Sequence, residues 1–167
     1  MILAFDTYYF ENKAKTVCLQ FANWNDKIPV QIFSEIKEDV SEYESGAFYK
    51  RELPCILSLL NKINLDEVSM IVVDGFVFLD DEYKPGLGAH LFNSLEQRIP
   101  IIGVAKTNFA QINNIKREVY RGESRKPLYI TSVGINIDEA STYVESMYGQ
   151  YRIPDLLKQL DSMTKVK

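Results

Sequence analysis

The sequence lacks the features that mark membrane and secreted proteins. Among its 167 residues, no apolar run reaches the roughly 20 residues that a helix needs to span a bilayer. The first residues, Met1–Asp6, reach an acid too soon for a secretory signal, which needs a basic start and a longer apolar stretch. The two cysteines, Cys18 and Cys55, do not have the spacing of metal ligands. We therefore expect both to be reduced and to lie in the core of a cytoplasmic protein.

The sequence also lacks the excess of positive charge that is typical of general nucleic-acid-binding proteins. It has 19 basic and 23 acidic side chains, for a net charge of −4. This balance argues against a general nucleic-acid binder. It does not argue against a metal-dependent nuclease, because bound ions neutralise part of an acidic site. One segment, 116–126, is basic, and a solvated loop or a phosphate contact would each have that composition.

Apolar periodicity predicts an α/β fold. With 46% hydrophobic and 25% charged residues, the chain is typical of a globular protein, and its length favours one domain over residues 1–167. The expected strands are Ile2–Tyr8, Lys15–Phe21, Pro29–Ile36, Met70–Val73, Pro100–Ala105 and Pro127–Ser132, and the expected helices are Tyr49–Asn61, Leu87–Gln97, Ile137–Tyr148 and Pro154–Met163. Short loops join the first three strands. We therefore expect an antiparallel meander, then parallel strands, in a mixed sheet with helices on both faces.

Two aspartates stand where buried strands end. Asp6 follows the apolar residues 2–5, and Asp74 follows 71–73. A buried lone carboxylate costs several kcal/mol unless it is paired or binds a cation. Glu52, at the start of the first helix, could reach the same edge of the sheet. Three oxygen ligands suit Mg²⁺ or Mn²⁺ better than Zn²⁺, and Lys106 ends the next strand as a neighbouring cation.

Structural interpretations of the same residues stay open. Asp74 precedes a glycine, which is a common turn sequence, and Glu52 could serve only as a favourable charge at a helix start. The test is geometric: the carboxyl groups of Asp6, Glu52 and Asp74 should lie close enough to share an ion. For the single histidine, His90, we expect packing or hydrogen bonding rather than metal binding.

Several segments resemble the endonuclease V family, whose members cut nucleic acid near inosine. The matching segments are Ala4–Tyr8, Tyr43–Gly46, Phe48–Pro54, Val73–Gly75, Ile99–Lys106 and Lys126–Ile130. The spacing from the glycine to the glutamate, Gly46 to Glu52, also agrees with the family pattern. The resemblance covers most of the chain and implies a ribonuclease H-like fold.

The resemblance also implies roles for individual residues. Asp6, Glu52 and Asp74 would hold Mg²⁺ or Mn²⁺, with Lys106 as an active-site cation. Tyr43 would be a wedge that separates the strands beside the lesion. The other expected contacts to DNA or RNA, which could contain inosine, are Gly46, Arg51, Arg121 and Lys126. The products would carry a 5′-phosphate and a 3′-hydroxyl, and the protein would act as a cytoplasmic monomer.

The chain departs from the family pattern in two places. After the third aspartate the family has Gly-x-Gly and then His-Pro-Arg, whereas residues 75–81 here are largely apolar. The family histidine that follows the Lys-Pro-Leu strand is missing from 131–136, where Asn136 or Asp138 could partly replace it. Three functions therefore stay open: a metal-dependent endonuclease, an endonuclease V-like protein that binds nucleic acid without efficient cleavage, and an unrelated α/β enzyme whose acids only resemble the site.

Overall fold

The computed structural model describes residues 1–40 and 48–166. Its strands are β1 (Ile2–Phe10), β2 (Lys13–Phe21), β3 (Gln31–Lys37), β4 (Met70–Asp74), β5 (Ile101–Ala105), β6 (Arg117–Val119) and β7 (Leu128–Val133). Its helices are α1 (Tyr49–Leu60), α2 (Leu87–Ser94), α3 (Ile137–Ser146) and α4 (Asp155–Thr164), with a short 3₁₀ helix, η1 (Leu65–Glu67). Tyr43 and Gly46 lie outside the described residues, so the structure does not place them.

The seven strands form one mixed sheet in the order β3-β2-β1-β4-β5-β7-β6. The first three form the expected antiparallel meander, and β1, β4 and β5 run parallel. The predicted fold class is therefore confirmed, although β7 runs antiparallel to β5. The sequence analysis missed β6, which lies in the basic segment. Its three residues carry no period-two pattern, and they pair because β7 offers them a free edge.

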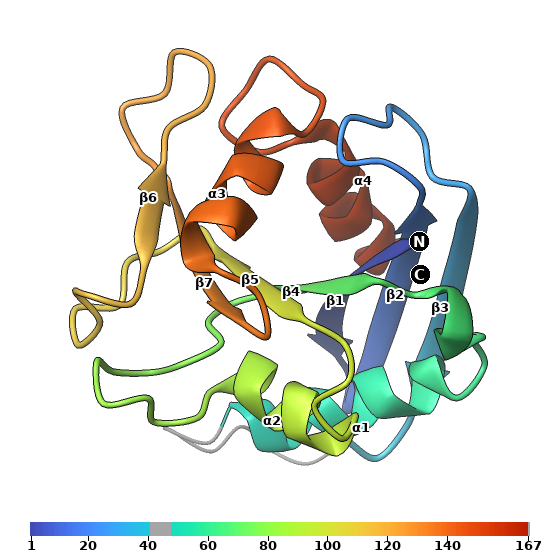
Figure 1. Ribbon diagram of the computed structural model, residues 1–167. Coiled ribbons are helices and arrows are strands. Elements are labelled where there is room, and N and C mark those ends of the chain that lie inside the picture. Colours follow the sequence, from blue (N-terminus) through green and yellow to red (C-terminus); the bar gives the residue numbers. More distant parts are fainter. Residues whose placement is uncertain (41–47, 167) are drawn as a thin grey trace.

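The helices cover both faces of the sheet, with α1 and α2 on one side and α3 and α4 on the other (Figure 1). Side chains alternate along β1, so Ala4 packs in the core under α3 and α4, whereas Leu3 and Phe5 pack in the core under α1 and α2. Cys18 and Cys55 are buried free thiols, as expected. Because both faces of the central strands are buried, these strands are continuous apolar runs in the sequence.

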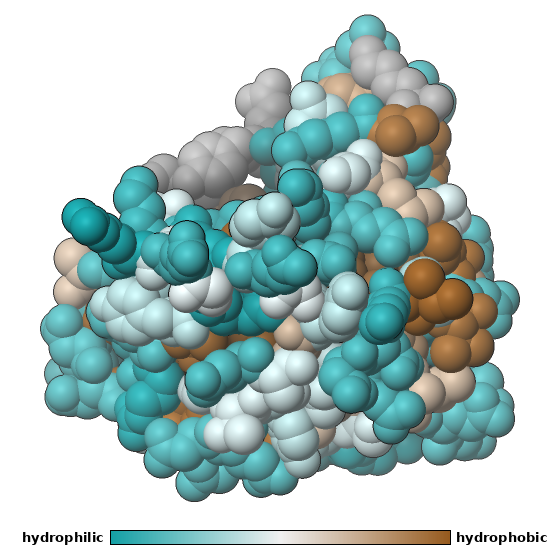
Figure 2. Space-filling model, turned by 90° about the horizontal axis from the view of Figure 1, so that it is seen from above, coloured by the Kyte–Doolittle hydropathy of each residue, from teal (hydrophilic) through white to brown (hydrophobic). Residues whose placement is uncertain are grey.

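The edge strand β3 is less well covered than the centre of the sheet. Ile32 and Ile36 of β3 are exposed, and so are Ile28 and Val30 just before it. From above, hydrophobic surface gathers on the right-hand side, where Figure 1 places β3 (Figure 2). In the described part of the chain, no helix is both long and apolar enough to cross a membrane.

A close approach at Gly103 of β5 holds the turn that follows β4. A Cβ atom at Gly103 would lie 2.5 Å from the Gly75 carbonyl oxygen and 2.7 Å from Thr131 Oγ1. Thr131 Oγ1 in turn accepts a hydrogen bond of 2.8 Å from the Val77 backbone N–H. Gly75 has φ +123°, which favours glycine. The backbone after Asp74 is thus packed directly onto β5 and β7.

We predict that Gly103→Ala lowers the free energy of unfolding by about 1–3 kcal/mol, because backbone and a bonded hydroxyl flank the added methyl group and neither can move freely. Urea denaturation measures the change. Ser34→Ala, on the exposed side of β3, is the control and should leave stability nearly unchanged. Wild-type stability for Gly103→Ala would show that the turn yields without strain.

Candidate metal centre and nucleic-acid interface

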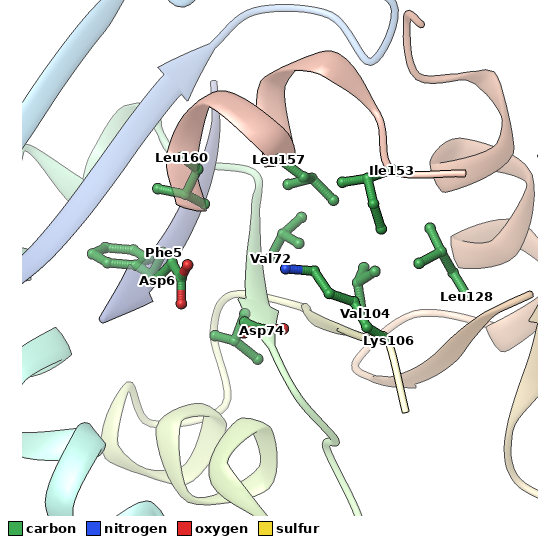
Figure 3. A pocket seen from close by; sticks show the side chains of 11 residues that line it. Phe5, Asp6, Val72, Asp74, Val104, Lys106, Leu128, Ile153, Leu157 and Leu160 are labelled. Atoms are coloured by element: carbon green, nitrogen blue, oxygen red, sulfur yellow. The ribbon is translucent and has the colours of Figure 1, made fainter. Parts of the chain in front are cut away.

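Asp6 and Asp74 lie side by side at one edge of the sheet. Phe5 pairs with Val73 in the parallel β1–β4 ladder, and the two aspartates stand one position further along. Both point to the side covered by α4, where the Lys106 side chain extends toward them across a pocket (Figure 3). The backbone N–H of Thr7 donates a 2.9 Å hydrogen bond to Asp6 Oδ1. The parallel register therefore brings together two acids that are 68 positions apart in the sequence.

The two aspartates share a strongly perturbed electrostatic environment. Burial, then the charge of Asp74, raises the pKa of Asp6 to about 7. Burial also raises the pKa of Asp74, while the Lys106 ammonium acts in the opposite direction on both carboxyl groups. Two like charges side by side disfavour the simultaneous ionisation of both carboxyl groups. The site therefore favours a proton or a bound cation at neutral pH.

Glu52 reaches the same region from α1, on the other side of the sheet. Its side chain is only 2% exposed. Burial raises the pKa of Glu52 well above its usual value, and the charges of Asp6 and Asp74 raise it further. The ring of Tyr9 also lies nearby, since the charge of Glu52 contributes to a raised pKa for that phenol. Glu52 thus belongs electrostatically to the acidic site.

The donor chemistry fits a hard divalent cation, but the three-carboxylate ligand set expected from the sequence is not preformed. Among the residues described, no three His, Cys, Asp or Glu side chains form a group that could hold a metal ion. Mg²⁺ usually keeps several waters and binds proteins through one or two carboxylates together with substrate phosphates. Adjacent Asp6 and Asp74 satisfy that requirement, and Glu52 feels the charges of both.

A fourth acid, Asp161 of α4, joins the site and was missed by the sequence analysis. Its charge raises the pKa of both Asp6 and Asp74. Asp161 Oδ2 also accepts a 3.0 Å hydrogen bond from Nζ of Lys165, the residue that caps the C-terminal end of α4. In the sequence, Asp161 is indistinguishable from a solvent-facing residue of an amphipathic helix. It reaches the site only because α4 packs over β1 and β2, with Leu157 and Leu160 lining the pocket (Figure 3).

The expected nucleic-acid contacts have different placements. The Arg51 guanidinium stacks on the Tyr9 ring, 3.6 Å from its centroid. Lys126 is exposed. Arg121 is buried, and its guanidinium donates to the backbone carbonyls of four residues: Met147, Gly149, Tyr151 and Arg152. Arg121 therefore joins the end of β6 to the loop between α3 and α4, and we leave it out of the proposed phosphate contacts.

The remaining candidate side chains have structural partners. Asn136 caps α3 and accepts hydrogen bonds from the N–H groups of Asp138 and Glu139. Asp138 Oδ1 pairs with Arg117 Nε at 2.8 Å. His90 stacks on Tyr49, with ring centroids 3.6 Å apart, in the packing role expected for it. Neither Asn136 nor Asp138 contributes to the electrostatics resolved at the acidic site.

A second pocket opens on the other side of the Asp74–Gly75 link. It has a volume of about 710 Å³, is open to solvent, and lies between α1, α2 and the loop after β5. Its lining includes Phe48, Tyr49, Phe76, Asn108 and Phe109. The rings of Phe76 and Phe109 lie 5.9 Å apart and form one aromatic wall. An aromatic cavity of this kind suits a flat, apolar-faced ligand.

Sequence comparison identifies one family. The family model for Endonuclease V matches residues 1–124, which carry β1 to β6, Glu52, Asp74 and Lys106. The match ends before β7, α3 and α4, so Asp161 lies outside it. No curated protein matches the chain as a relative.

Solved structures of endonuclease V share the fold. The Bacillus subtilis protein is 20% identical, with a TM-score of 0.75 over 98% of this chain and 77% of that one. The Ciona intestinalis protein, in complex with a 24mer DNA containing an inosine followed by a ribo-adenosine, is 16% identical, with a TM-score of 0.76 over 98% and 84%. The human protein is 20% identical, with a TM-score of 0.72 over 98% and 82%. The chain therefore has the ribonuclease H-like fold of these proteins, C-terminal helices included.

The raised pKa of Asp6 predicts a pH-dependent stability in the absence of metal. The folded state retains a proton that the unfolded carboxyl loses near pH 3.8, so stability falls as pH rises from about 4 to 7. In EDTA at pH 8, Asp6→Asn should therefore be more stable than wild type by about 2–4 kcal/mol. At pH 4 the two should be nearly equal.

Urea denaturation at both pH values measures this difference, with the exposed Asp66→Asn as a control that should follow wild type. Mg²⁺ should raise the melting temperature of wild type and raise that of Asp6→Asn less, because ligands stabilise the state that binds them. Equal stability of wild type and Asp6→Asn at pH 8 would mean that the ionised Asp6 carboxylate does not destabilise the folded state.

Proposed function

The chain belongs to the endonuclease V family, and we propose that it is a metal-dependent endonuclease that hydrolyses a phosphodiester bond near inosine in DNA or RNA. The observation that carries the proposal is the adjacency of Asp6, which is buried, and Asp74, which is more open to solvent, with Lys106 directed toward them. Such a pair is unfavourable unless a cation binds there. A nuclease site that binds a divalent ion would account for the two adjacent acids, because the ion would offset their repulsion.

In this mechanism, Asp6 and Asp74 would hold Mg²⁺ or Mn²⁺, and Glu52 and Asp161 would bind waters around it. The ion supplies activation of the attacking water and charge stabilisation for the leaving oxygen. Lys106 would neutralise the phosphate or orient the attacking water, since its ammonium already faces the aspartates. The products would carry a 5′-phosphate and a 3′-hydroxyl.

The aromatic pocket would receive the base, which leaves the stack before the backbone is cut. Aromatic side chains bind an extruded base by stacking, and Phe76 and Phe109 provide such a wall. Gly75 lines this pocket, while the preceding residue, Asp74, lines the acidic pocket. A base held in one pocket would thus place its neighbouring phosphates at the other.

Phosphate contacts would come from the exposed Lys126 and from Arg51, which Tyr9 holds by stacking. Tyr43 and Gly46, outside the described residues, remain proposed contacts on the basis of the motif. We further propose that residues 1–167 form a single domain that acts as a cytoplasmic monomer. The continuous sheet that separates both cores supports the single domain.

A second candidate is a protein that binds inosine-containing nucleic acid without efficient cleavage. Two observations favour it. The histidine of the family pattern is missing after β7, and no three possible metal ligands lie together among the described residues. The buried acids argue for the enzyme, because a site without catalysis has no physical reason to keep Asp6, Glu52 and Asp74 close together and desolvated.

The decisive experiment is cleavage of a labelled single-stranded oligonucleotide with one inosine, in Mg²⁺ or Mn²⁺. We predict cleavage that depends on inosine and on metal, and a loss of at least about a hundredfold in Asp74→Asn, which keeps the shape but not the charge. Asp66→Asn is the control. Cleavage without inosine preference would show that the substrate is not defined by inosine. Binding without cleavage would favour the second candidate.

For Asp161→Asn we predict a decrease in cleavage rate of about tenfold to a hundredfold, because the outer carboxylates of a metal site tune its affinity. Raising the Mg²⁺ or Mn²⁺ concentration should restore part of the rate, whereas a residue that only packs α4 would show no metal dependence. Circular dichroism and a melting curve check that α4 stays folded. Wild-type cleavage at limiting metal would exclude Asp161 from the site.

A further inference from the structure

Asn108 contributes a side-chain amide to the wall of the aromatic pocket. It follows β5 by three residues and lines the pocket together with Phe76 and Phe109. The neighbouring lining group Thr107 is a hydroxyl, which can donate or accept. A side-chain amide differs from a hydroxyl because its donor and its acceptor lie on separate atoms. The orientation of the Asn108 amide therefore decides which ligand groups it can bind.

A lysine fixes that orientation. Lys116 Nζ donates a hydrogen bond to Asn108 Oδ1. Because an ammonium group has donors and no acceptor, only the amide oxygen can face it. Lys116 is itself held over the Tyr129 ring, with Nζ 5.4 Å from the centroid. The group of Asn108 that remains for a ligand is the Nδ2 amide, a donor polarised by the positive charge beside it.

The loop that carries Asn108 and Lys116 is fastened to the opposite side of the pocket. Asp81 Oδ1, in the segment after β4, accepts hydrogen bonds of 2.8 Å from the backbone N–H groups of both Asn113 and Asn114. The backbone N–H of Ile112 also donates to the Phe109 carbonyl at 3.1 Å. These bonds brace the loop, so the Asn108 donor is held in place before a ligand arrives.

We propose that Asn108, oriented by Lys116, is the residue that selects a 6-keto purine such as hypoxanthine over a purine with no oxygen at position 6. This inference rests on the proposed function and deepens it. A keto oxygen accepts from the Nδ2 amide, and the 6-amino group of adenine cannot. N3, N7 and the stacking face are common to all purines, so the aromatic wall alone does not discriminate between them.

The test compares two oligonucleotides that differ along one edge of a single base. One carries inosine, and the other carries purine riboside, which has the same rings without the 6-oxygen and without the proton on N1. Binding is measured by fluorescence anisotropy with Ca²⁺ in place of Mg²⁺, and cleavage is measured with Mg²⁺. We expect wild type to prefer inosine by about tenfold, the effect of one hydrogen bond.

In Asn108→Leu the preference should fall to near one, because the donor is gone while the pocket stays apolar. In Asn108→Asp it should also be lost, since a carboxylate repels the keto oxygen. Lys116→Met should weaken the preference, because the amide is then free to turn over. The matched control is Gln111→Glu, the same amide-to-carboxylate change at an exposed position of the same loop that does not line the pocket. It should keep the wild-type ratio.

The outcomes separate the inference from the function on which it rests. A wild-type preference that survives in Asn108→Leu overturns the role of Asn108 while leaving the nuclease intact. Equal binding of both oligonucleotides by wild type overturns selection by the 6-oxygen. If folded wild-type protein neither binds nor cuts any inosine-containing strand, the proposed function and this inference fail together.

Discussion

Two carboxylates side by side at the ends of neighbouring parallel strands are the constraint on which the rest of this structure depends. Asp6 is buried, and the negative charge of Asp74 beside it opposes its ionisation. The hydrogen bond from the Thr7 backbone N–H lowers the pKa of Asp6, and the Lys106 ammonium lowers the pKa of both aspartates. Burial and the neighbouring negative charges outweigh these effects, so the pKa of each aspartate stays raised. The negative charge that remains suits a divalent ion, whose binding would relieve the repulsion between the two aspartates.

The two functional pockets share a single peptide link. Asp74 faces the acidic pocket under α4, while Gly75 turns the chain toward the aromatic pocket beside α1 and α2. Gly103 lets this turn lie directly on β5, where a larger residue would collide with backbone. Under the proposed function, the positions of the reacting phosphate and of the bound base would therefore be set by the same few atoms. A displacement in this turn would move both pockets relative to each other.

The part of the chain after residue 124 adds an acid and a covering helix to the site. Residues after 124 lie outside the family match, and the histidine typical of the family is missing from the segment that follows β7. The helix α4 brings Asp161, and Lys165 at its C-terminal end, to the acids, and its leucines line the pocket. Arg121 holds the loop before α4 through four carbonyls. A basic residue that resembled a phosphate contact thus supports the helix that carries a site acid.

The sequence by itself determined the elements and most of the acids, because these depend on local signals. Apolar periodicity located six of the seven strands and all four helices, and the carboxylates Asp6 and Asp74 stood out because a strand end is visible in the sequence. Tertiary structure alone decided that β6 pairs with β7, that Arg121 is buried, that Asp161 joins the site and that Glu52 does not close a three-ligand group with the aspartates. Each of these depends on how elements distant in the chain pack together, and a pattern of neighbouring residues carries no record of that packing.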